Sequence, residues 1–344
     1  MGLELSSTQV ISMNLLVTGG LGFIGSNFIQ NLLTTTDYNV TNIDKIGIGA
    51  NQENLKNHIT NPNYRFIKTD ITQKASLSQL INETDVVIHF AAETHVDRSI
   101  NDPTPFLESN IIGTFNLLEA ERKLNKPIRH IQISTDETYG DITKGSFKEE
   151  DRLKPSNPYS ATKAAADMLC HAYHRTYGLD IIVTRCTNNF GPHQFPEKLI
   201  PKTIIRAQKN LQIPVYGTGE NVRDWIYVLD HCEAIDLILR KGRTGETYNI
   251  SSGNELSVIT IAKKILDILD KPEELITFVE DRPGHDVRYS LDSSKIRREL
   301  GWKPRHSFEE VLEKTVEWYM ENDWWWRPII NEEILHPTPW KLEK

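Results

Sequence analysis

Residues 14–25 read NLLVTGGLGFIG, and this stretch decides the fold. Its apolar run is typical of a buried strand, and a helix is predicted to follow over residues 23–33. Between the two, Gly19, Gly22 and Gly25 recur at every third position. Glycines at this spacing permit a tight turn, a close approach of the backbone to a diphosphate, and close packing of helix on strand. The stretch therefore predicts a dinucleotide-binding strand–helix unit.

The rest of the first half alternates short apolar runs with amphipathic stretches, which predicts a doubly wound parallel sheet of the Rossmann type. Further strands are expected at 39–43, 64–68, 86–90, 129–134 and 181–185, and helices at 104–123 and 159–177.

After Asn188 the pattern loosens into loops with short helices, which indicates a smaller substrate-binding lobe. We expect a nucleotide domain of residues 12–188 with 225–252, and a lobe of residues 189–224 with 253–330. Helices at 257–269 and 308–322 and the aromatic stretch 318–326 are expected to form the core of the lobe.

Composition narrows the class of protein. Hydrophobic residues make up 38% and charged residues 25% of the 344 residues, as in ordinary globular proteins. The net charge of −8 argues against non-specific nucleic-acid binding. Cys170, Cys186 and Cys232 have spacings that suit neither a disulfide framework nor a metal site. The first twelve residues do not resemble a signal peptide, and no apolar run approaches the ~20 residues of a membrane span. A soluble, cytoplasmic protein is expected.

Acidic residues at strand ends indicate which dinucleotide is bound. Asp44 follows Gly25 by nineteen residues, where a carboxylate can accept hydrogen bonds from the adenosine ribose. A 2′-phosphate would be repelled there, so NAD is favoured over NADP, with the neighbouring Lys45 as a weak counter-signal. Asp70 and Ile71, after the third strand, are candidates to bracket the adenine.

The candidate catalytic residues follow the fifth strand. Tyr159 and Lys163 lie four apart on one helix face, so the ammonium is expected to lower the pKa of the phenol and make it a usable base. Thr135 can bind a sugar hydroxyl. Asp136 and Glu137 are adjacent carboxyl groups, of which one is expected to be held protonated by burial and by the other.

Residues 89–99 run from the fourth strand into a loop, where the small side chains of Ala91 and Ala92 leave room for a nicotinamide. Four further residues of this segment are polar: His89, His95, Asp97 and Arg98. We expect this charged loop to be self-paired, and no metal site is predicted because no further cluster completes a ligand set.

Taken together, these motifs resemble the extended short-chain dehydrogenase/reductase superfamily, and within it most closely the dTDP-glucose 4,6-dehydratase family. The resemblance runs from about residue 14 to 328 and includes residues 188–201, 223–225 and 281–285. It is specific because epimerases and decarboxylases of this superfamily usually lack the Thr-Asp-Glu run at 135–137.

The resemblance implies a mechanism. Tyr159, assisted by Lys163 and Thr135, would take the 4-hydroxyl proton while C4 passes hydride to NAD. Glu137 would then remove H5, Asp136 would protonate the departing 6-hydroxyl, and the hydride would return to C6. A homodimer through the helices at 104–123 and 159–177 is also implied.

The resemblance also implies binding residues. For the cofactor it adds, to the residues above, Phe23, Ile24, Phe90, Thr94, Ser109 and Asn189. For the nucleotide sugar it implies Thr94, Thr135, Asn188, Lys198, Leu199, Pro214, Tyr216, Arg223, Asn254, Arg282 and His285. The guanidinium groups of Arg223 and Arg282 can clamp a diphosphate with forked hydrogen bonds.

Alternative functions remain at this point. Thr138, Phe190 and Val258 depart from the family pattern, so UDP-glucose and UDP-N-acetylglucosamine are alternative substrates. An NDP-sugar 4-epimerase needs only Tyr159 and Lys163. A non-catalytic NAD-binding sensor needs the glycine loop alone.

Overall fold

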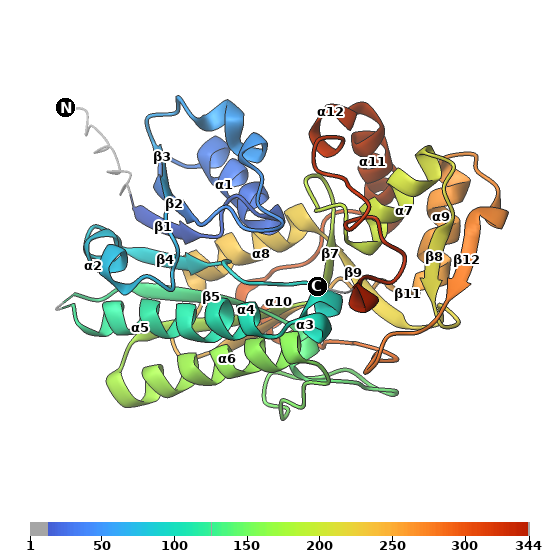
Figure 1. Ribbon diagram of the computed structural model, residues 1–344. Coiled ribbons are helices and arrows are strands. Elements are labelled where there is room, and N and C mark those ends of the chain that lie inside the picture. The colour runs from blue at the N-terminus through green and yellow to red at the C-terminus, as the bar shows by residue number, and fades with distance from the viewer. Residues whose placement is uncertain (1–12, 125, 343–344) are drawn as a thin grey trace, which may run out of the picture.

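A seven-stranded parallel sheet forms the larger part of the molecule in the computed structural model, which describes residues 13–124 and 126–342 (Figure 1). The strands lie in the order β10-β6-β5-β4-β1-β2-β3, and all neighbouring pairs are parallel. Their bounds are β1 (Asn14–Thr18), β2 (Asn39–Asp44), β3 (Tyr64–Lys68), β4 (Val86–His89), β5 (Arg129–Thr135), β6 (Asp180–Cys186) and β10 (Thr247–Ile250).

The six predicted strands are confirmed, with ends that differ by at most one residue, and β10 is an addition. The prediction about the first twelve residues lies outside the described residues. No helix among those described is long and apolar enough to cross a membrane.

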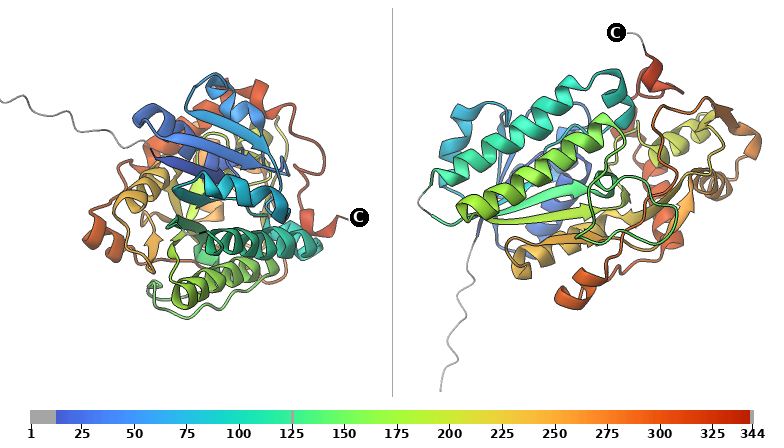
Figure 2. Two further views of the ribbon diagram at one scale, coloured as in Figure 1. Left: turned by 90° about the vertical axis from the view of Figure 1, so that its left-hand side faces the viewer. Right: turned by 90° about the horizontal axis from the view of Figure 1, so that it is seen from below.

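Helices cover both faces of the sheet, which explains why its strands are apolar on both sides. On one face lie α1 (Phe23–Thr35) and α8 (Val228–Lys241), and on the other α2 (Lys74–Asn82), α5 (Thr114–Arg122) and α6 (Pro158–Tyr177) (Figures 1 and 2). Successive β1 side chains alternate between the two cores: Leu15 and Val17 pack toward α1, and Leu16 packs toward α2 and α5.

The strand order reverses next to β1, because the chain moves outward through β2 and β3 and then returns to β4 on the other side. In such sheets a crevice opens at the carboxyl ends of the strands at this point. The predicted Rossmann-type fold is therefore confirmed, and the crevice is where the site is to be sought.

The helix predicted at 104–123 contains a π-helical stretch. It consists of α4 (Thr104–Phe106), the π-helix η2 (Leu107–Gly113) and α5, and it follows the short α3 (Val96–Asn101). Wider π-helical turns are frequent at functional sites. A Cβ atom on Gly113 would lie 2.4 Å from Cδ1 of Ile71, so a side chain there would collide with the loop after β3.

The remaining elements form a second, smaller assembly, seen on the right of Figure 1. Its sheets are β11-β9-β7 and β12-β8. Its strands are β7 (Asn188–Phe190), β8 (Ile213–Tyr216), β9 (Val222–Tyr227), β11 (Glu255–Ser257) and β12 (Ile276–Val279), and its helices are α7 (Leu199–Gln208), α9 (Val258–Ile268), α11 (Phe308–Glu321) and α12 (Asp323–Trp326). Short or outlying helices are η1 (Gln52–His58), η3 (Asp136–Thr138), η4 (Glu273–Leu275), α10 (Ser294–Leu300) and η5 (Pro339–Lys341).

The helices predicted at 257–269 and 308–322 correspond to α9 and α11. Their buried faces share one core with Phe190, Trp325 and Trp326, which confirms the predicted packing of the aromatic stretch. The division of the chain into two domains stays a prediction.

Candidate active site

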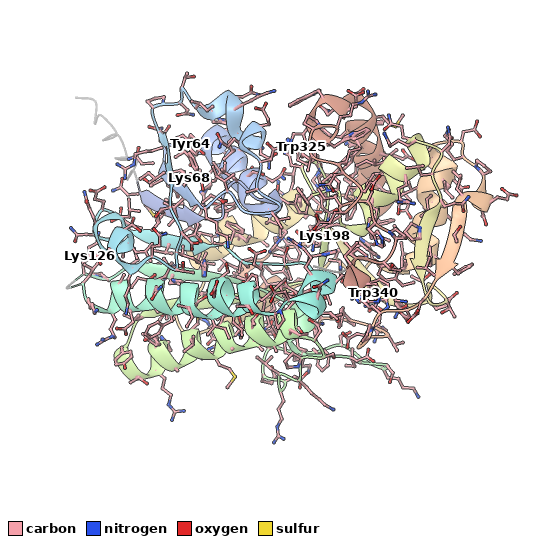
Figure 3. All side chains as sticks on the ribbon, viewed as in Figure 1. Tyr64, Lys68, Lys126, Lys198, Trp325 and Trp340 are labelled. Carbon is pink, nitrogen blue, oxygen red and sulfur yellow. The ribbon has the colours of Figure 1, made fainter. Side chains whose placement is uncertain are left out.

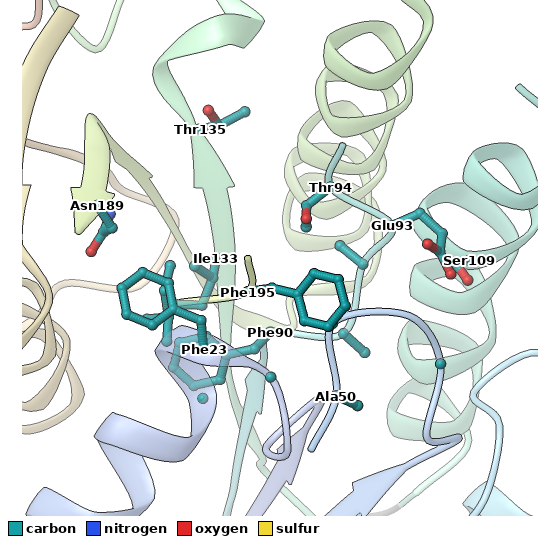
Figure 4. A pocket seen from close by; sticks show the side chains of 18 of the residues that line it. Phe23, Ala50, Phe90, Glu93, Thr94, Ser109, Ile133, Thr135, Asn189 and Phe195 are labelled. Carbon is teal, nitrogen blue, oxygen red and sulfur yellow. The ribbon is translucent and has the colours of Figure 1, made fainter. Parts of the chain in front are cut away.

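One pocket at the carboxyl ends of β1, β2, β4, β5 and β6 brings together most of the predicted site residues (Figure 4). The predicted cofactor residues that line it are Gly19, Gly22, Phe23, Ile24, Gly25, Asp44, Lys45, Ile71, Phe90, Ala91, Ala92, Thr94, Ser109 and Asn189. All five catalytic candidates line it as well: Thr135, Asp136, Glu137, Tyr159 and Lys163. Asn188 and Lys198 complete the predicted set in this pocket.

The glycine loop is packed so tightly that it excludes side chains. Gly19 has a φ of +70°, and a Cβ atom on it would lie 2.6 Å from the backbone nitrogen of Ala91. A Cβ atom on Gly25 would lie 2.6 Å from the carbonyl oxygen of Gly19. Gly22 is the N-cap of α1 and offers no side-chain cap, so the first N–H groups of the helix have no side-chain acceptor there. The loop thus presents backbone donors to an anion.

The end of β2 carries Asp44, whose carboxylate is held by backbone groups. It accepts hydrogen bonds from the N–H groups of Leu21 at 3.1 Å and Ile46 at 2.8 Å. Lys45 turns away from it, since its Nζ donates to Ser109 Oγ at 2.9 Å and pairs with Glu93 at 3.0 Å. Lys45 is thus paired with Glu93 at the same edge of the pocket.

Only one of the two residues predicted to bracket the adenine lines the pocket. Ile71 lines the pocket, whereas Asp70 does not, because its Oδ1 accepts a hydrogen bond from Thr72 N at 2.9 Å and closes a turn.

The adjacent carboxyl groups lie at the start of η3, directly after β5. Asp136 is buried, and burial together with the neighbouring Glu137 charge raises its pKa to about 8. Thr135 Oγ1 donates to Asp136 Oδ1 at 3.1 Å, while Oδ2 has no hydrogen-bond partner among the described residues. Burial also raises the pKa of Glu137. Burial therefore favours the protonated form of Asp136, and the expectation that one carboxyl of the pair is held protonated stays a prediction.

The expected effect of Lys163 on Tyr159 is wrong for this structure. The Lys163 ammonium donates to the carbonyl of Ile133 in β5 at 2.6 Å. Burial raises the pKa of Tyr159 well above its ordinary value, and the Glu137 charge raises it further. Desolvation and the neighbouring carboxylate therefore shift the pKa of the phenol in the direction opposite to the expected one.

The expected pairing within residues 89–99 is also wrong, since the main partners come from the smaller assembly. Arg98 donates to Glu197 at 3.1 Å, and Asp97 accepts from Arg282 at 2.8 Å. Within the segment, His95 approaches Asp97 only at 4.0 Å. Among the described residues no group of histidine, cysteine and acidic side chains has the arrangement of a metal site.

Seven predicted substrate residues do not line the pocket: Leu199, Pro214, Tyr216, Arg223, Asn254, Arg282 and His285. Arg223 donates to the carbonyl groups of Val222 at 2.8 Å and Asp286 at 2.9 Å and lies over the Tyr289 ring. Arg282 is paired with Asp97. The roles of these residues toward a diphosphate stay predictions.

Comparison with known proteins decides the family. The family model described as GDP-mannose 4,6 dehydratase matches residues 16–315. The chain belongs to this family. It is 46% identical to dTDP-glucose 4,6-dehydratase of Neisseria meningitidis, over 92% of this chain and 96% of the relative, and 50% identical to the low-salt glycan biosynthesis protein Agl12 of Haloferax volcanii, over 90% and 100%.

Among solved structures, DesIV of Streptomyces venezuelae, a dTDP-glucose 4,6-dehydratase with NAD and TYD bound, is similar with a TM-score of 0.90 and 44% identity, covering 92% of this chain and all of that one. The predicted resemblance to dTDP-glucose 4,6-dehydratases is therefore confirmed.

Sequence reasoning missed several lining residues of this family member. They are Ile43, Gly47, Ile48, Gly49, Ala50, Thr69, Glu93, Ile133, Ser134, Cys186, Thr187, Gln194, Phe195 and Glu197. Ile133, Ser134 and Cys186 lie at carboxyl ends of parallel strands, so strand assignment alone was a sufficient signal. Gln194, Phe195 and Glu197 lie on the loop after β7, which carries no such periodic signal.

The pKa of Asp136 gives a direct prediction. In a chain labelled with carboxyl-¹³C aspartate, one resonance, identified by its loss in Asp136→Asn, is expected to titrate with a midpoint of about 8. Asp136 is protonated below that pH and ionised above it. Glu137→Gln removes the neighbouring charge and is expected to lower the midpoint. A midpoint at about 4, the ordinary value, would contradict the arrangement.

Proposed function

We propose that the chain is an NAD-dependent nucleotide-sugar 4,6-dehydratase that converts dTDP-glucose to dTDP-4-keto-6-deoxyglucose. One observation carries the proposal: Asp136, whose pKa is raised to about 8 by burial and by Glu137, shares a pocket with Glu137, Tyr159 and the glycine loop. Elimination of water needs an acid and a base together, and this pair supplies both. The dTDP-glucose 4,6-dehydratases similar to the chain support the substrate.

The residues of the pocket fit NAD. Gly19 and Gly25 leave no room for a Cβ atom against the neighbouring backbone, which keeps the turn tight, and the uncapped start of α1 offers N–H groups to a diphosphate. Asp44 is placed to accept ribose hydroxyls with its remaining lone pairs. The structure of DesIV with bound NAD adds support.

The proposed chemistry divides between the side chains. Bound NAD supplies the hydride acceptor at C4 and the donor at C6, and its positive ring favours the phenolate of Tyr159. Tyr159, held near Thr135, takes the proton of the 4-hydroxyl. The 4-ketone acidifies H5, which Glu137 removes, while Asp136 gives its proton to the departing 6-hydroxyl. When C6 is reduced, Glu137 returns its proton to C5, which completes the 4-keto-6-deoxy product. Asp136 is protonated before the reaction because burial and Glu137 raise its pKa.

The alternatives leave features unexplained. A 4-epimerase needs Tyr159 and Lys163 but gives no role to the buried Asp136–Glu137 pair. A sensor needs the glycine loop but no protonated carboxyl in the pocket. UDP-glucose and UDP-N-acetylglucosamine are the alternative substrates, so the substrate panel below includes them.

Mass spectrometry of the products tests the reaction. The full chain with NAD is incubated separately with dTDP-glucose, UDP-glucose and UDP-N-acetylglucosamine. Because water is eliminated, dTDP-glucose is expected to yield a product lighter by one water. A product of unchanged mass with an inverted C4 in its NMR spectrum would show an epimerase, and unchanged substrate in all three incubations would refute both enzymes.

Two variants separate the oxidation from the elimination. Tyr159→Phe is expected to lower turnover and cofactor reduction together by at least about 100-fold, because the phenol serves the first step. Glu137→Gln is expected to lower turnover by a similar factor while reduced nicotinamide accumulates, which its absorbance reports. Glu150→Gln, an exposed glutamate on the loop that follows η3, is the matched control. Normal turnover of Glu137→Gln would assign the base elsewhere.

We further propose that the chain forms a homodimer through the outer faces of η2, α5 and α6, which lie side by side in Figure 2. Four apolar side chains on these elements are exposed: Leu107, Ile112, Met168 and Tyr177. Exposed apolar groups clustered on neighbouring helices are typical of an interface between subunits. A second copy of the chain is the occupant that the family resemblance favours.

Light scattering tests the dimer. Wild type is expected at twice the mass of one chain, and Met168→Glu at the mass of one chain, because a charge would be buried in the contact. Ile59→Glu, equally exposed but located after η1, is expected to stay dimeric. Wild type at the mass of one chain would contradict the proposal.

A cytoplasmic location and the two-domain division are also proposed. The three cysteines are free and buried, which suits a reducing compartment. The proposed division is a nucleotide domain of residues 12–188 with 225–252 and a lobe of residues 189–224 with 253–330. Hydrophobic cores under the large sheet and among α7, α9 and α11 support two units, although Ile296 and Trp302 pack in the first core and Trp225 in the second.

A further inference from the structure

We propose that the C-terminal strap, residues 328–342, positions the nucleotide-binding part of the substrate site, and that Trp340 is the residue through which it acts. The inference rests on the proposed function, because it concerns the substrate of that same site. The matching family model ends at residue 315, so the strap lies beyond the part of the chain that defines the family.

The strap is tied to the smaller assembly through its backbone. Lys202 and Arg206, both on α7, donate to the carbonyl groups of His336 at 2.8 Å and Leu335 at 2.6 Å. Leu335 is buried in the core that α7 shares with α11. Lys202 is itself buried, and burial lowers its pKa to about 8. The carbonyl of His336 serves as its hydrogen-bond acceptor in place of water. These contacts hold the middle of the strap in one place.

The end of the strap reaches the other half of the molecule. Asn101, the last residue of α3, donates from Nδ2 to the carbonyl of Leu342 at 2.6 Å. Since α3 follows β4 of the large sheet and α7 belongs to the smaller assembly, the strap bridges the two. In Figure 3 the labelled Trp340 lies near their junction, on the same side as Lys198.

Trp340 packs against a predicted substrate residue. It is only 9% exposed, and its ring centroid lies 4.6 Å from that of Tyr216 at an interplanar angle of 77°. Edge-to-face contacts of this kind fix the orientation of both rings. Tyr216 ends β8, and no other aromatic ring lies as close to it among the described residues.

The orientation of Tyr216 matters because its hydroxyl belongs to a network across the crevice. It donates to Asp97 Oδ2 at 3.0 Å, and Arg282 donates to Asp97 Oδ1 at 2.8 Å. Burial and the Asp97 charge raise the pKa of the phenol, which therefore stays a donor. Tyr216 and Arg282 are both predicted nucleotide contacts, and both bind the Asp97 carboxylate. The Trp340 ring that holds Tyr216 therefore also fixes the position of Arg282 through this carboxylate. Trp340 is thus a positioning residue.

The test compares Trp340→Ala, Trp340→Phe and the control Trp324→Ala in the full chain. Trp324 is a 44% exposed tryptophan on α12 that contacts Lys56 and not Tyr216. Calorimetry measures the Kd of dTDP, and steady-state kinetics measures KM and kcat for dTDP-glucose. Trp340→Ala is expected to raise Kd and KM about tenfold with kcat within about twofold, because only the ring contact is lost. Trp340→Phe is expected to stay within about threefold of wild type, and Trp324→Ala to match it.

The outcomes separate positioning from stability and from the proposed function. A lower Tm of Trp340→Ala with unchanged Kd and KM would show a purely structural role and overturn the inference. If Trp340→Ala does not fold, Trp340→Leu replaces it with the same expectations, since leucine keeps apolar volume without a ring. A wild-type chain that binds dTDP but converts no nucleotide sugar would refute the proposed function, while the dTDP affinities would still test the strap.

Discussion

Burial of two neighbouring carboxyl groups is the constraint on which the rest of the site depends. Charges that are withdrawn from water and placed side by side cannot both persist, so one carboxyl keeps its proton. Here Asp136 does so, with a pKa of about 8, beside Glu137. The fold creates this environment, because β5 runs through the interior of the sheet and ends in η3, where Asp136 is buried. Two adjacent carboxyl groups with different pKa values are thus held at the end of β5.

The same burial explains why the expected behaviour of Tyr159 is not observed. A spacing of four on a helix places Lys163 on the correct face, but it does not say which acceptor the ammonium chooses. In the buried helix the Lys163 ammonium donates a hydrogen bond to the carbonyl of Ile133. Desolvation then acts on the phenol without a close cation to offset it. The spacing of charged residues in the sequence therefore predicts which side chains lie near each other. The direction of a pKa shift also depends on how deeply the group is buried, and the spacing does not give that.

The fold of the first half could be predicted because its signals are local. Apolar runs such as β1 and the glycine loop depend on neighbours within a few residues, and their bounds agree with the structure. The π-helical stretch η2 could not be predicted, since its apolar pattern is that of an ordinary helix; the close approach of Gly113 to Ile71, far away in sequence, appears only in the tertiary fold. The partners of Asp97 and Arg98 were likewise hidden, because Arg282 and Glu197 come from segments that only the tertiary fold brings together.

These long-range pairs have a common consequence for the crevice. Asp97 and Arg98 lie on α3, the helix after β4, and each forms an ion pair with a residue of the smaller assembly. Each ion pair is largely buried, so separating its members would leave a charge unpaired in a poorly solvated place. These two ion pairs therefore help to hold the two halves together. This arrangement suits a site that must admit a charged nucleotide, because a phosphate can exchange partners with an arginine at lower cost than it can enter a packed apolar interface.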